Sequence, residues 1–94
     1  MLKIVAKSLI KDNELEKAIA LYNELVEETR KENGCISYEL FQDINNKNTL
    51  IMIEEWESET YFEAHKNTEH FIRIVSQISN IRLNSEINIL HKVV

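Results

Sequence analysis

The spacing of apolar residues changes along this chain in a definite order, and that order limits the folds available to it. Residues 2–10, LKIVAKSLI, are rich in branched side chains and predict a β-strand. From Asn13 onward the apolar positions follow helical spacing over about five turns. They are Leu15, Ala18, Ile19, Tyr22, Leu25 and Val26.

The helix boundaries carry their own signals. Asn13 followed by Glu16 resembles a capping box, in which two side chains satisfy the first free backbone N–H groups. Gly34 is the only glycine of the chain, and it stands where a left-handed backbone conformation is needed after the helix.

The middle of the chain predicts a β-hairpin. Residues 35–43, CISYELFQD, alternate with Ile36, Tyr38 and Leu40 on one side, and residues 49–56, TLIMIEEW, follow the turn signal INNKN. A helical region is expected from Ser58, with a break near Asn67 and Thr68.

After that break a second helical piece places Phe71, Ile74, Val75 and Ile78 on one face, and residues 86–94 read as a last strand. The predicted order is strand, helix, strand, strand, helix, strand. In 94 residues this order indicates one α+β domain, residues 1–94, with the ferredoxin-like βαββαβ arrangement and a four-stranded antiparallel sheet.

In this arrangement both helices cover the same face of the sheet, so the other face should be polar if it meets water. Here the four successive residues 50–53 are apolar, and the last strand carries apolar residues on both sides, among them Ile87, Ile89 and Leu90. An exposed apolar face is unusual on a monomer, which predicts a homodimer with the two sheets packed face to face.

Composition excludes several classes of function. The net charge of −5 without a basic run disfavours nucleic-acid binding, and one cysteine, Cys35, permits no internal disulfide. No stretch is apolar enough to span a membrane and the first residues do not resemble a signal peptide, so we expect a cytoplasmic protein. One glycine leaves no glycine-rich phosphate loop.

Residues 54–70 contain most of the side chains that could take part in a reaction. Helical geometry places His65 between Tyr61 and Phe62 on the apolar side of its helix, so this histidine should point inward. An inward histidine is more often structural than catalytic, and His70 lies at the margin of the next apolar face.

Glu54 and Trp56 share one strand face, where Glu54 is either paired with a cation or has a raised pKa. His65, His70 and Glu63 do not have the spacing of a strong metal motif, so no metal is expected.

Three segments together resemble the antibiotic biosynthesis monooxygenase family, and most closely its quinol monooxygenase branch. They are ENGCISYEL (32–40), IEEWES (53–58) and EAHKNTEHF (63–71). One departure is Glu69, where the family often has proline. The haem-degrading branch has an asparagine in the first strand and a Trp followed ten residues later by a His. It fits poorly here, because the first strand lacks asparagine, position 65 is histidine, and Val75 stands ten residues further on.

The resemblance implies a dimeric protein that oxygenates quinols or related aromatic substrates with O2, without metal or flavin. The resemblance implies, by position, five site residues in this chain: Tyr38, Glu54, Trp56, His65 and His70. His65 suits the role of general base, and His70 or Tyr38 could donate a hydrogen bond to a developing oxyanion or peroxide.

Trp56, Tyr61 and Phe62 could form apolar walls that stack on a flat substrate ring. Two other readings stay open. The same fold and pocket would serve a non-enzymatic dimer that binds a small ligand or regulates, or an isomerase that uses histidines as acid and base.

Overall fold

The computed structural model describes all 94 residues and has the predicted order of elements, with the second helical region divided in two. The strands are β1 (Leu2–Ile10), β2 (Cys35–Asp43), β3 (Asn46–Trp56) and β4 (Arg82–Leu90), and the helices are α1 (Leu15–Thr29), α2 (Glu59–Lys66) and α3 (Glu69–Ser79). No helix of the structure has the length and apolar character needed to cross a membrane.

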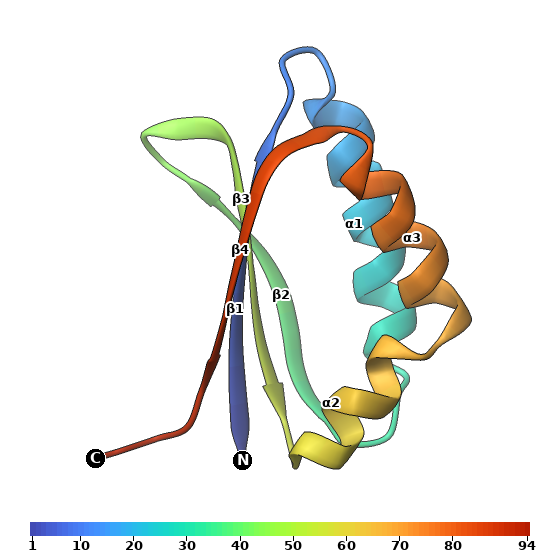
Figure 1. Cartoon of the computed structure of the whole chain (residues 1–94), viewed down its shortest axis with the longest axis vertical. Coiled ribbons are helices and arrows are strands. Elements are labelled where there is room, and N and C mark those ends of the chain that lie inside the picture. Colours follow the sequence, from blue (N-terminus) through green and yellow to red (C-terminus); the bar gives the residue numbers. More distant parts are fainter.

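The strands form one antiparallel sheet in the order β2-β3-β1-β4, and the helices lie on one side of it (Figure 1). This is the ferredoxin-like βαββαβ fold predicted from the sequence. Helices α1 and α3 pack side by side over the sheet, while α2 lies near the end of β3.

The buried core lies between the helices and the covered face of the sheet. In β3 every second residue from Leu50 to Trp56 is buried, as period-two alternation requires. In α1 the buried residues Ala18, Tyr22, Leu25 and Thr29 form one stripe, and in α3 Ile74 and Ile78 do the same.

Several local predictions were wrong. Asn13 does not cap α1, because it has a positive φ of 68° and the helix begins after Glu14 without a side-chain cap. Ile36 is half exposed rather than inward beside Tyr38, because the pairing of β2 with β3 shifts by one residue between Cys35 and Ser37. The last strand begins at Arg82 and ends at Leu90, so His91 lies outside it.

The break between α2 and α3 lies where it was predicted. Ser58 precedes α2 without a side-chain cap, whereas the Thr68 hydroxyl accepts a hydrogen bond from the Phe71 N–H and caps α3. The change of direction between the two helices brings His65 and His70 close together, with ring centroids 6.4 Å apart.

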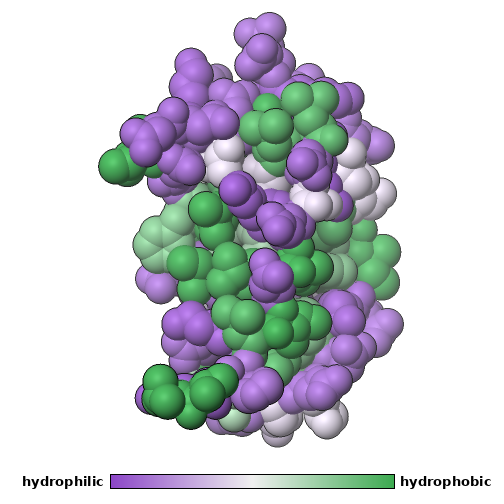
Figure 2. Space-filling view, turned by 60° about the vertical axis from the view of Figure 1, so that its left-hand side comes forward, coloured by the Kyte–Doolittle hydropathy of each residue, from purple (hydrophilic) through white to green (hydrophobic).

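The open face of the sheet is largely apolar. Figure 2 shows apolar side chains gathered on this face, with polar side chains between them. By strand register and alternation its apolar residues are Val5, Leu9, Phe41, Ile51, Ile53 and Leu90. Ile87 and Ile89 belong to the covered face instead, because they pair with Ala6 and Ile4, yet both remain more than half exposed at the sheet edge.

Candidate active site

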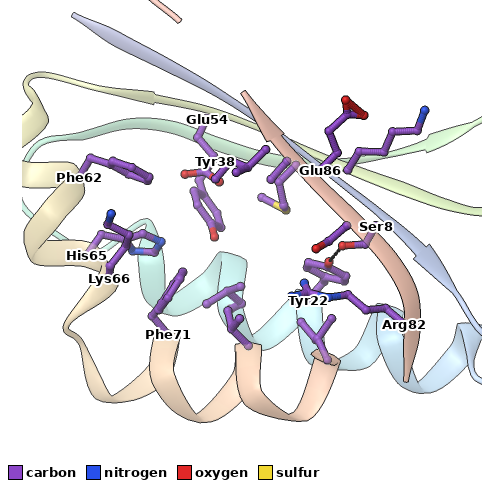
Figure 3. Close-up of a pocket in the computed structure, with 18 residues that line it drawn as sticks. Ser8, Tyr22, Tyr38, Glu54, Phe62, His65, Lys66, Phe71, Arg82 and Glu86 are labelled. Carbon is purple, nitrogen blue, oxygen red and sulfur yellow. Dashed lines mark hydrogen bonds between the residues drawn. The ribbon is translucent and has the colours of Figure 1, made fainter. Parts of the chain in front are cut away.

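A cavity of about 270 Å³ lies between the covered face of the sheet and the helices (Figure 3). Side chains from all four strands and all three helices line it. At one end lie Phe62 and His65 of α2, and at the other lie Ser8, Tyr22 and Arg82. Such a volume suits a molecule of one or two aromatic rings, since it falls below the range of about 300–1,000 Å³ typical of drug-sized ligands.

His65 is buried, as its place in the helix predicted, with 1 % of its surface exposed. Its ring lies among aromatic side chains, with centroid distances of 4.7 Å to Trp56, 4.8 Å to Phe71 and 5.4 Å to Tyr38. Burial lowers the pKa of His65 below 6.5, although the hydrogen bond to Glu32 opposes this shift. This shift favours the neutral form of the imidazole.

Glu32 connects the two histidines. Its Oε2 lies 2.8 Å from Nδ1 of His65 and 2.7 Å from Nε2 of His70. A carboxylate accepts hydrogen bonds, so Nδ1 of His65 carries the proton and Nε2 of that ring is left with a free lone pair. This Nε2 is buried and has no hydrogen-bond partner.

The turn between α1 and β2 positions Glu32. The Glu32 N–H donates to the Thr29 carbonyl, and its own carbonyl accepts from the Cys35 N–H. Gly34, two residues later, has a φ of 83°, which favours glycine. A Cβ at Gly34 would also overlap the ring of Tyr61, so glycine lets α2 pack closely on the turn that presents Glu32.

Glu54 and Tyr38 supply oxygen atoms to the cavity wall. Burial raises the pKa of Glu54 to about 7, while a hydrogen bond of 3.0 Å from Nε1 of Trp56 opposes the shift. Burial also raises the pKa of Tyr38 far above its usual value, so this hydroxyl stays protonated, and it points into the cavity (Figure 3).

The structure brings four of the seven predicted site residues to the cavity wall: Tyr38, Glu54, Phe62 and His65. Trp56 is not part of the wall, because it is completely buried behind Glu54 and His65. Tyr61 is not part of it either, because its ring packs on Gly34 and remains 39 % exposed. His70 reaches Glu32 rather than the cavity.

Sequence reasoning missed Glu32, Phe71 and Arg82 as site residues. Glu32 precedes the glycine turn and lies 33 residues before His65, so no helical or strand spacing relates the two. The one available signal was that Glu32 belongs to the ENGC segment that carries the family resemblance.

Glu32, His65 and His70 are also the residues that could hold a metal ion, since one ligand atom of each lies within 4.8 Å of the others. This set differs from the set considered from sequence, because Glu32 takes the place of Glu63. The N–H groups of both histidines donate to one oxygen of Glu32, and these two hydrogen bonds account for the short distances among the three side chains without a metal ion.

Comparison with known proteins decides the family. The sequence profile described as "Antibiotic biosynthesis monooxygenase" matches residues 1–77. The chain belongs to the antibiotic biosynthesis monooxygenase family. Membership of this family supports a monooxygenase-like function.

Similar proteins match most of the chain. The Bacillus subtilis (strain 168) protein named "Putative monooxygenase YcnE" is 30 % identical over 77 residues, which are 82 % of this chain and 81 % of that protein. A crystal structure of an antibiotic biosynthesis monooxygenase is 35 % identical with a TM-score of 0.95, and the match covers 99 % of both chains. A conserved protein of Methanosarcina mazei Go1 has the same identity and TM-score over 98 % of this chain and 92 % of its own.

Proposed function

We propose that this chain oxygenates a small, electron-rich aromatic substrate of the quinol type with O2, with His65 as the general base and without a metal or flavin. One observation carries the proposal: a neutral histidine lines an aromatic cavity and has one nitrogen bound to a carboxylate and the other nitrogen free. Family membership supports the reaction class.

The first step is removal of a proton. Glu32 fixes the tautomer of His65, so the lone pair of Nε2 is available to accept the proton of a substrate hydroxyl. Glu32 also stabilises the imidazolium that forms, in the way that a carboxylate supports histidine in a catalytic triad. His70 donates to the same oxygen and holds the carboxylate in place.

The remaining steps need no other redox partner. The deprotonated substrate passes one electron to O2, and the two radicals combine to form a C–O bond. The imidazolium returns its proton to the peroxide. The O–O bond then breaks as the proton on the same carbon leaves, which produces a carbonyl group and one molecule of water. One oxygen atom enters the product, and the substrate supplies all four electrons.

The cavity wall supports this chemistry. Phe62 and Phe71 provide apolar surface against which a flat ring can lie, and this surface excludes water from the radical pair. The protonated Tyr38 hydroxyl can donate a hydrogen bond to the developing peroxide.

Oxygen uptake with a panel of reduced quinones tests the proposal, with the uncatalysed autoxidation rate of each compound as the baseline. We expect uptake above that baseline for at least one small quinol, with one atom of labelled oxygen in the product. Binding without uptake would favour the ligand-binding module instead. Rearrangement of a substrate without oxygen uptake would favour the isomerase.

We also propose that two copies join through the open face of the sheet. The apolar residues of this face lie beside one another on neighbouring strands, where contact with a second copy would remove them from water. Ile53→Lys should shift the sedimentation of the protein toward the 11.1 kDa monomer. Ile72→Lys, on the exposed side of α3, is the matched control. A wild-type monomer at micromolar concentration would remove this proposal.

A further inference from the structure

The far end of the cavity contains an arginine without a partner. Arg82, the first residue of β4, is partly buried and lines the cavity, yet its side chain forms no hydrogen bond or ion pair. The other two arginines are both engaged: Arg30 donates to the carbonyl of Tyr38, and Arg73 pairs with Glu24 and Glu69. A guanidinium offers five N–H donors, so Arg82 presents an unused cation to whatever occupies the cavity.

Hydroxyl groups accompany Arg82. The Tyr22 hydroxyl donates to Oγ of Ser8 across 3.1 Å, and both residues are buried (Figure 3). Because its oxygen accepts this bond, the Ser8 hydroxyl keeps its own hydrogen to donate. Ser85 of β4 pairs with Ser8 in strand register and also lines the cavity.

No carboxylate of the cavity wall neutralises Arg82. Glu86 pairs with Lys7 in register, and its side chain points away from the cavity (Figure 3). Glu54 is level with Ile4 of β1, whereas Arg82 is level with Ile10 near the other end of that strand. Burial raises the pKa of Glu54 to about 7, which leaves it partly uncharged at pH 7. Lys66, the cation at the histidine end, is already paired with Glu63 at 3.0 Å.

We propose that Arg82, with Ser8 and Ser85, binds a carboxylate group carried by the aromatic substrate while the substrate ring lies against His65. A planar carboxylate matches the guanidinium fork, and the hydroxyls supply further donors. This proposal rests on the proposed function for the identity of the site, but it concerns recognition rather than oxygen chemistry. It narrows the substrate class to aromatic acids of one or two rings.

Calorimetric titration with two ligands that cannot be oxygenated as quinols tests whether Arg82 binds a carboxylate. Naphthoate carries the carboxylate, and naphthamide is its neutral counterpart of similar shape. We expect the wild-type protein to bind naphthoate about 10-fold tighter or more, the scale of a charge-assisted hydrogen bond. In Arg82→Met the two ligands should bind about equally, whereas Arg82→Lys should keep part of the preference because it keeps the charge.

Lys47→Met is the matched control, because it removes one exposed cation from the hairpin away from the cavity and should leave the preference intact. Three outcomes would each overturn the proposal. The wild-type protein could bind the two ligands equally, it could fail to bind naphthoate, or the preference for naphthoate could survive in Arg82→Met. Its failure is distinguishable from failure of the proposed function. Oxygen uptake with neutral quinols can occur without the carboxylate preference, and the preference can exist without oxygen uptake.

Discussion

The two ends of the cavity differ in how their polar groups are satisfied. At the histidine end, Glu32 binds both His65 and His70, so one nitrogen of His65 is fixed and only Nε2 is free. At the arginine end, the side chain of Arg82 has no hydrogen-bond or ion-pair partner in the protein. A group held in one orientation is suited to a chemical step, while an unpaired cation is suited to holding a ligand.

This comparison predicts different kinetic effects. Substitutions at the histidine end should lower kcat with little change in KM, because they remove interactions made in the transition state. Substitutions at the arginine end should raise KM with little change in kcat, because a remote carboxylate contact is the same in the ground state and the transition state.

The largest effect is expected for His65→Ala. It removes the base, so kcat for quinol oxygenation should fall by about 10²-fold or more, the scale of general base catalysis. Stopped-flow oxygen consumption measures this, and circular dichroism checks that the fold is intact. His91→Ala, beyond the end of β4, should retain wild-type turnover. Unchanged turnover in His65→Ala would exclude His65 from the mechanism.

Glu32→Gln should have the next largest effect, a fall in kcat of about 10-fold or more, because the imidazolium loses its counter-charge. The pH profile of kcat separates this role from a structural one. Loss of the carboxylate should lower the pKa of His65 further, so the acid limb of the profile should move to lower pH. Glu28→Gln on α1, whose carboxylate pairs with Lys31, provides the control. An acid limb that stays in place would argue against electrostatic support from Glu32.

Arg82→Met should raise KM for a quinol carrying a carboxylate by about 10-fold, while kcat and the KM for a neutral quinol stay unchanged. Initial-rate kinetics with the two substrates measure both constants. An equal rise in KM for the neutral substrate would mean that Arg82 shapes the cavity rather than binds charge.

Glu54→Gln should alter turnover less than these changes but should change how stability depends on pH. The pKa of Glu54 is about 7 in the folded chain and 4.5 without the protein environment, so the folded state binds more protons between these values. This group therefore lowers stability as pH rises from 4.5 to 7, by a total on the order of 3 kcal/mol. Urea unfolding measures the free energy of unfolding at pH 5 and at pH 8. The difference between these two free energies should be smaller in Glu54→Gln than in the wild-type protein.

Removal of metal should have the smallest effect. After dialysis against a chelator, oxygen uptake should remain within about twofold of its initial value, because the proposed step uses protein groups alone. Loss of uptake that added metal restores would instead assign Glu32, His65 and His70 as metal ligands.

Local patterns were sufficient to predict much of the fold. Branched side chains identified β1, period-two alternation identified β2, helical spacing identified α1 and α3, and the break at Asn67 and Thr68 was placed correctly. The errors at Asn13 and Ile36 both come from local backbone irregularities that periodicity does not encode, a left-handed residue at Asn13 and a one-residue shift in strand pairing at Ile36. The inward direction of His65 could be predicted because it depends only on the helix that carries it.

The sequence by itself determined the order of the elements and the burial of His65, because each depends on residues close together in the chain. Only the tertiary structure decided that Glu32 joins His65 to His70, that Trp56 and Tyr61 lie outside the cavity wall, and that Arg82 is unpaired. These features depend on contacts between different elements, such as that between Glu32 and His65, which are 33 residues apart. Periodicity shows which face of an element turns inward, but packing decides which side chains meet there.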